Sequence, residues 1–404
     1  MVYPHVSAMG YAKFMTGSAK FHAWKVDFTF NFSNFFDYIV LTGFDIVNFL
    51  FIFLILYVLF LKRVIAREHF ILFSLISLVP MLLNNVLFPP SYLGDQHKYL
   101  YVTQSFRHLV FDVNIKDVST TVFFSSIFMS LVPVPFIETI NSIGFVNKFI
   151  YLGLIIFCIH RKYVTNNIVI FLCLYPSALL YSSLSLRDTI VLVTMFLVVF
   201  SYLRRHRMIA LLALYYLFLI KPQNALIIIV FLCIFSFLTK GRFFNRYKVF
   251  FLIPVGIIAA ALPLLIEEID YFRLAFFVED GGIPTDYVPI ESFSGLVSEL
   301  LFGWAKFLVR PLPFQAQNIF QLIQSFENLL ILALIIYYCA QMSQYNKMIV
   351  FKWLTFLVIS LAVYSLVVFN FGTAARYKFP FIVLFFIFLS YEIRQFIAQR
   401  GYKS

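Results

Sequence analysis

Residues 38–61 read YIVLTGFDIVNFLFIFLILYVLFL and end directly before Lys62 and Arg63. At 1.5 Å per residue, a helix over this stretch rises about 36 Å, which is enough to cross a hydrocarbon layer of about 30 Å. Similar apolar runs of roughly 17 to 25 residues recur along the chain. The sequence therefore predicts an all-α, polytopic transmembrane helical bundle.

The composition supports the same class. Of the 404 residues, 62% are hydrophobic and only 12% are charged, too little polar surface to cover a soluble domain of this size. Alternating segments of about ten residues, which are typical of membrane β-barrels, are absent. The four cysteines lie inside apolar runs, with a spacing that suits neither a metal site nor a disulfide framework.

The net charge of +12 comes mainly from short basic clusters next to the apolar runs, which hold 17 of the 31 Lys and Arg residues. Clusters of this kind stay on the cytoplasmic side of a membrane, so we interpret them as topology signals and not as a nucleic-acid surface. They are Lys62/Arg63/Arg67, Arg161/Lys162, Arg204/Arg205/Arg207, Lys240/Arg242/Arg246/Lys248, Lys347/Lys352 and Arg394/Arg400/Lys403.

With these clusters inside, the chain divides into an external, interfacial N-terminal segment (1–37), a transmembrane catalytic domain (38–396) and a cytoplasmic tail (397–404). About eleven crossings are expected. Of the apolar stretches 118–136 and 148–160, only one crosses, and Pro133 and Pro135 favour a re-entrant or interfacial element in the first. The expected external loops are 89–117, 182–188, 221–224, 267–324 and 370–378.

The first external loop carries Asp95 and Gln96 directly after a turn residue. Asp95 is either a general base toward a sugar hydroxyl or a solvated loop acid. Tyr99, Arg107 and the neighbouring Gln104 and His108 give the loop the mixed polar and aromatic character of a carbohydrate-binding surface.

The segment 182–188 ends in Arg187 and Asp188, where a helix is expected to begin with Ser185 as a possible cap. A guanidinium beside free backbone N–H groups favours a phosphate. The alternative is an Arg187–Asp188 pair that only anchors the helix at the membrane interface.

Lys221 and Gln223 lie at the turn of an apolar hairpin whose first arm is shorter than the bilayer. Lys221 is therefore expected below the outer surface, with a partner, in a watery cleft or snorkelling. In the segment 267–324, Arg310 is expected at the mouth of a cavity. Gln317 is expected beside the sugar hydroxyl that Asp95 would activate. The acidic, Gly-rich part of this segment favours a mobile lid over a calcium loop.

The last external turn carries Arg376, Tyr377 and Lys378. The two cations, one residue apart, either clamp a diphosphate or mark the membrane interface. Gly372-Thr373 and Pro380 favour a defined turn.

The order of these motifs resembles the Wzy-type O-antigen and exopolysaccharide polymerases, whose architecture is related to the GT-C glycosyltransferases. The residues that carry the resemblance span roughly 40–395. They are Gly94-Asp95-Gln96 with Tyr99, Pro176-Ser177 with Ser183 and Arg187-Asp188, Arg310-Pro311-Leu312-Pro313-Phe314, and Asn370-Phe371-Gly372-Thr373 with Arg376-Tyr377.

The resemblance implies that glycan repeat units linked to undecaprenyl diphosphate, as donor and acceptor, are joined at the periplasmic face of the bacterial inner membrane. It implies no metal or other cofactor, and a chain-length regulator as a possible partner. Arg187, Arg310 and Arg376 would then bind diphosphate, with Lys221 and Lys378 as helpers. No histidine stands beside these arginines in the sequence, so Asp95 is the expected base, and Gln96, Tyr99 and Gln317 would orient the acceptor.

Three other functions stay open. A GT-C transferase would move one sugar from a polyprenyl monophosphate, and a ligase would transfer finished glycan to a lipid core. A flippase or transporter for lipid-linked oligosaccharides would show paired charges near the middle of the bilayer and an internal repeat.

Overall fold

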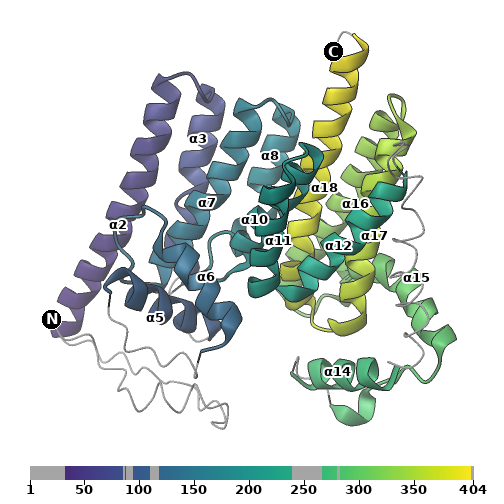
Figure 1. Ribbon diagram of the computed structural model, residues 1–404. Coiled ribbons are helices and arrows are strands. Elements are labelled where there is room, and N and C mark those ends of the chain that lie inside the picture. The colour runs from purple at the N-terminus through teal and green to yellow at the C-terminus, as the bar shows by residue number, and fades with distance from the viewer. Residues whose placement is uncertain are drawn as a thin grey trace. The chain divides into compact units, whose positions relative to one another are not determined.

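The computed structural model describes residues 32–84, 87, 94–109, 118–238, 266–279 and 283–401 (Figure 1). The regular elements within these ranges are all helices, as the hydrophobic runs predict. The expected N-terminal interfacial segment up to residue 31 and residues 239–265, which include the Lys240–Lys248 cluster, lie outside them.

Five of the described helices are long and apolar enough to cross a membrane, as expected of a helical membrane protein. The larger number of about eleven crossings includes shorter apolar helices and stays a prediction. Helix α6 is only 11 residues long, or about 16 Å, in line with the expectation that 118–136 does not cross. The five are α2 (Phe32–Leu61, apolar from Val40), α7 (Ile140–His160), α16 (Ile319–Ser343), α17 (Lys347–Val367) and α18 (Phe371–Arg400).

The chain forms two compact units, and the first holds residues 1–157, 179–194 and 215–222. Helices α2 and α3 pack along each other, and Phe60 of α2 stacks on Phe70 of α3 with ring centroids 5.3 Å apart. Helices α5 and α6 also pack together. Besides α2 and most of α7, this unit contains α3 (Arg67–Ile76), α4 (Val79–Leu83), α5 (Asp95–Arg107) and α6 (Thr120–Ser130).

The second unit holds residues 158–178, 195–214 and 223–404. Helix α17 packs against both α15 and α18. The run 378–391 of α18 is buried on every side, as expected of a helix that is apolar all round. This unit contains α8 (Asn166–Leu174), α14 (Ile266–Glu279), η4 (Pro284–Asp286), α15 (Phe293–Val309), η5 (Pro313–Gln315) and α16 to α18. The two units share α9 (Pro176–Tyr181), α10 (Asp188–Leu203), α11 (Arg207–Ile220) and α12 (Pro222–Leu238).

Three helix ends close in the same way, with a basic residue in the left-handed conformation. Arg63, Lys162 and Arg205 have φ values of 56°, 56° and 64°. In each turn the next backbone N–H bonds to a carbonyl five residues earlier, as in a Schellman motif. All three residues belong to predicted cytoplasmic clusters, and a cation is favoured at a helix C-terminus.

Three of the expected external loops contain helices. The loop 89–117 contains α5, the stretch 267–324 contains α14 and α15, and α18 begins at Phe371 inside the expected turn 370–378. Two of these helices lack the usual sequence signal. The first turns of α18 and all of α5 carry polar residues without an apolar run, and the Gly and Pro of α18 are typical of a turn.

Candidate functional site

In the first unit, α5 and α7 hold the irregular segment before α10 in place. The Nδ2 of Asn147 donates to the carbonyls of Leu184 and Leu186, at 2.6 and 2.7 Å. The backbone N–H of Ser185 donates to the Oε1 of Gln96 at 3.0 Å. Residues 182–186 are all buried, so these bonds satisfy backbone groups that water does not reach.

Helix α7 also approaches this segment very closely at Gly144. A Cβ atom at this position would overlap the carbonyl oxygen of Ser183. Four residues further along α7, the Nζ of Lys148 donates to the Oγ of Ser182 at 2.8 Å. A small residue and two polar ones on α7 therefore fix the path of the chain up to Leu186.

Arg187 follows directly, and α10 begins at Asp188. The Nε and Nη1 atoms of Arg187 are buried, and neither has a hydrogen-bond partner among the residues that the structure describes. Buried guanidinium donors are normally satisfied. Two donors and the positive charge of Arg187 thus lie at the start of α10 without a partner in the described part of the chain. Binding of an anion there stays a prediction.

Ser185 differs from the prediction. Its hydroxyl donates to the carbonyl of Ile140, and its N–H is taken by Gln96. Its role is to tie this segment to α7 and α5, and not to cap α10.

A chain of buried polar groups continues from Gln96 to α2. The amides of Gln96 and Asn84 bond to each other, with 3.0 Å for the bond that Gln96 donates, and Asn84 donates to Asn141 at 3.0 Å. Asn141 in turn donates to Asp45 at 3.1 Å. The Asp45 carboxylate also accepts bonds from Thr139 at 2.6 Å and from a further hydroxyl of α7.

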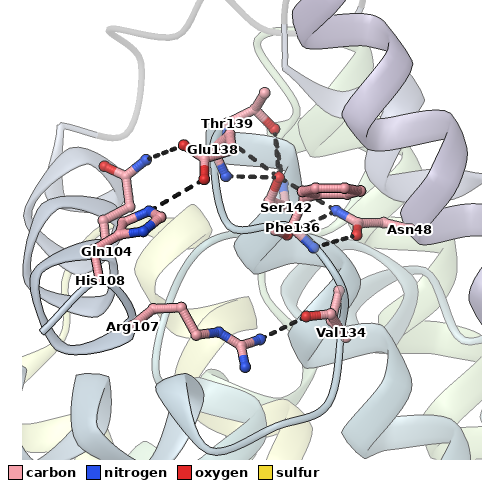
Figure 2. A network of polar contacts seen from close by, with 9 residues as sticks. All are labelled: Asn48, Gln104, Arg107, His108, Val134, Phe136, Glu138, Thr139 and Ser142. Atoms are coloured by element: carbon pink, nitrogen blue, oxygen red, sulfur yellow. Dashed lines mark hydrogen bonds and ion pairs between the residues drawn. The ribbon is translucent and has the colours of Figure 1, made fainter.

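The segment 131–139, between α6 and α7, is held from both sides (Figure 2). Asn48 of α2 exchanges two hydrogen bonds with the backbone of Phe136, at 2.9 and 3.0 Å. The Nη2 of Arg107 donates to the carbonyls of Val132 and Val134, at 2.9 and 2.5 Å. Burial lowers the pKa of the Arg107 guanidinium, which still stays charged at neutral pH.

Glu138, at the end of this segment, contacts two side chains at the end of α5, as Figure 2 shows. One carboxylate oxygen lies 3.1 Å from the Nε2 of His108. The other accepts a bond of 3.4 Å from the Nε2 of Gln104.

The structure gives the predicted residues of α5 several different roles. Asp95 is 56% exposed and pairs with Lys98 at 3.0 Å, so its surroundings are those of a solvated helix acid. Gln96 and Tyr99 are buried, at 1% and 3% exposed, which does not support their expected contact with the acceptor. Gln96 and Arg107 instead fix backbone segments.

Asp188 and Lys221, also in the first unit, are 4% and 6% exposed. Both side chains are thus buried within the protein, and the expected depth of Lys221 below the outer membrane surface stays a prediction. Gln223, which belongs to the second unit, is exposed at the start of α12.

In the second unit, Arg310 lines a cavity of about 170 Å³ at the end of α15. Lys306 and Glu299 lie in the same wall, with their charged groups 3.5 Å apart. Phe371 and Ala374, from the first turn of α18, contribute the opposite side. Arg310 thus lies at a cavity, as expected, whereas Gln317 is exposed and its N–H bonds to Gln321.

Of the two alternatives for Arg376 and Lys378, the contacts of Lys378 do not support a clamp. Lys378 is fully buried, and its Nζ donates to the Oδ1 of Asn328 and the carbonyl of Leu308. Asn328 also donates to the carbonyl of Arg310 at 2.8 Å. Two residues apart on a helix point in different directions, so Lys378 supports the end of α15, while Arg376 lies 5.9 Å from the ring of Tyr377.

Sequence reasoning missed the polar groups that position these sites. Asp45 and Asn48 lie three residues apart in the apolar run 38–61, and Asn141, Lys148 and Glu327 also fall in or beside apolar runs. Polar residues inside a span usually have a role, so their spacing on one helix face was a usable signal.

No protein-family model, curated protein or solved structure was found that matches this chain.

Proposed function

We propose that this chain is a membrane glycosyltransferase that polymerises oligosaccharide repeat units linked to undecaprenyl diphosphate at the periplasmic face of the bacterial inner membrane. The observation that carries the proposal is Arg187, whose buried Nε and Nη1 lack partners in the described part of the chain. The two residues before it are fixed, because Asn147 bonds to the carbonyl of Leu186 and Gln96 to the N–H of Ser185. A preorganised donor of this kind stabilises charge that develops on a leaving group.

In the proposed reaction, a hydroxyl oxygen of the acceptor forms a bond to the anomeric carbon of the donor sugar. The bond from that carbon to the diphosphate breaks, and its electron pair passes to the diphosphate, whose charge Arg187 stabilises. For Arg310 and Arg376, which belong to the second unit, binding of diphosphate stays a prediction from the resemblance.

Asp95 is the proposed base that takes the hydroxyl proton. In its support, Asp95 precedes Gln96, and Gln96 bonds to Ser185, two residues before Arg187. The start of α5 therefore lies beside the segment that carries the proposed diphosphate ligand.

The test is a gel of surface glycan from a strain that lacks this gene, complemented with the wild-type chain or with variants. Wild type should restore a ladder of repeat units. Arg187→Ala should lower polymer by about 100-fold or more and leave the amount of membrane-inserted protein unchanged. Arg207→Ala, which removes an exposed arginine at the start of α11, is the matched control and should be active. A ladder that is unchanged when the gene is deleted would exclude polymerisation.

A second function, transport of lipid-linked oligosaccharide, is favoured by one observation. Glu327 and Lys378 lie within α16 and α18, are 5% and 0% exposed, and interact electrostatically. Charges inside apolar spans often belong to a translocation path. If transport is the function, deletion should leave single lipid-linked units on the cytoplasmic side, whereas loss of a polymerase leaves them on the periplasmic side.

A further inference from the structure

The far end of α5 carries a polar cluster that the proposed chemistry does not use. It consists of His108, Glu138 and Gln104 (Figure 2). The His108 side chain is 51% exposed and that of Glu138 is 15% exposed. The carboxylate is thus shielded and oriented by two donors, while the imidazole remains open to a ligand.

The cluster is not needed to hold the segment 131–139. Asn48 and Arg107 already bond four backbone groups of this segment. Ser142 is a further polar partner of Thr139, at 2.9 Å between the hydroxyls. A half-exposed contact between His108 and Glu138 adds little stability to such a segment, so these side chains can bind a ligand without loss of the segment's structure.

The cluster lies at the opposite end of α5 from the residue that contacts the segment leading to Arg187. Gln96, near the first residue of α5, bonds to the segment that ends at Arg187, whereas His108 follows the last residue of the helix. Thirteen helical residues separate these ends by about 20 Å. If Arg187 binds the diphosphate, a group at this end of α5 is placed to contact sugars further along the glycan.

The chemistry of the cluster suits neutral sugars. A carboxylate accepts bonds from hydroxyl groups, an amide both donates and accepts, and an imidazole does either according to its tautomer. Glu138 and Arg107, which bonds to the backbone of the same segment from α5, carry opposite charges, so the cluster has no single strong charge to attract a charged ligand.

We propose that His108, Glu138 and Gln104 form a saccharide subsite for the part of the repeat unit distal to the diphosphate, and that this subsite selects which repeat unit is bound. The proposal rests on the proposed function for the identity of the glycan. It does not require that the chain catalyse transfer.

The test therefore measures binding of free sugar. The repeat-unit oligosaccharide is released from its lipid by mild acid hydrolysis, and its binding to the full-length protein in lipid nanodiscs is followed by saturation-transfer NMR. Wild type should bind it. His108→Ala and Glu138→Ala should weaken binding at least tenfold, and Arg187→Ala should bind as wild type does, because the free oligosaccharide carries no diphosphate.

Glu68→Gln and His160→Ala change exposed residues of the same types elsewhere and serve as controls. Glu138→Gln keeps an acceptor in place and should retain part of the binding, which guards against a misfolded alanine variant. Unchanged binding in both alanine variants, or no binding by wild type, would overturn the subsite. The surface-glycan ladder decides the proposed function separately.

Discussion

The carbonyl oxygen of Ser183 occupies the space that a Cβ atom of residue 144 would need. Gly144 therefore sets the distance between α7 and the segment that leads to Arg187. Because Asn147, on the same helix, bonds to both Leu184 and Leu186, a shift of the segment at Ser183 also strains these bonds.

Gly144→Ala should displace the segment 182–187 and abolish activity that depends on Arg187. Overpacking of this kind costs about 1–3 kcal/mol, so the melting temperature in detergent should also fall. Gly153→Ala is the matched control, because it lies on the same helix with no atom within 4 Å of its added Cβ. A Gly144→Ala variant with wild-type activity and melting temperature would show that the segment adapts freely.

The three basic residues whose backbone is in the left-handed conformation, Arg63, Lys162 and Arg205, give a prediction about the turns that end their helices. An L-residue in this conformation costs roughly 1–2 kcal/mol, which glycine avoids. Arg63→Gly, Lys162→Gly and Arg205→Gly should each keep or raise the melting temperature, whereas changes to Val should lower it. If each glycine variant is less stable by more than 1 kcal/mol, the basic side chains themselves hold the turns.

The prediction of the fold from the sequence succeeded where residues share an apolar environment. Residues 38–61 form a helix, as predicted, because each turn repeats the same apolar character. Met208 to Ile220 likewise form the short first arm of the predicted apolar hairpin. Helix α5 was expected to be loop because its polar residues give no period. The thirteen residues of α5 contain no apolar run. The face that is buried in the structure carries the polar side chain of Gln96 beside Tyr99.

The site was harder to predict because its bonds join distant parts of the chain. Asp45 and Thr139 are 94 residues apart in sequence, and Ser185 and Gln96 are 89 apart. The sequence identified Arg187 by its place before a span. It did not show which residues fix Arg187, nor that Lys378 points into the bundle, because side-chain direction depends on where α18 begins.

Tyr287 gives a prediction about pH. Its hydroxyl donates to the Asp270 carboxylate at 2.6 Å and accepts a bond from the Nε of Arg273 at 3.2 Å. Burial, together with Asp270, raises the pKa of Tyr287 above its ordinary value. A raised pKa stabilises the fold below the ordinary tyrosine pKa of about 10, and that contribution is lost as the pH rises through the folded value.

Wild type should therefore lose stability relative to Tyr287→Phe as the pH increases from about 9 to 11. The measurement is the melting temperature of both proteins across this range. Tyr271→Phe, which changes an exposed tyrosine on α14, is the control and should follow wild type. Parallel curves for wild type and Tyr287→Phe would contradict the raised pKa.

Glu327 and Lys378 allow the two candidate functions to be separated. Glu327 accepts bonds from the backbone N–H of Ser177 at 3.0 Å and from its hydroxyl at 2.5 Å, while Lys378 bonds to Asn328. Removing one member of a buried charge pair leaves the other uncompensated, which costs about 3–5 kcal/mol. Glu327→Gln and Lys378→Met should each be strongly destabilising.

The double variant Glu327→Gln/Lys378→Met should recover much of that loss, because neither charge is then left alone. If the chain is a polymerase, the recovered double variant should also make a glycan ladder, since the proposed reaction uses neither Glu327 nor Lys378. If the chain is a transporter that uses these charges, the double variant should be stable but inactive. A double variant no more stable than the single variants would show that the two residues do not act as a pair.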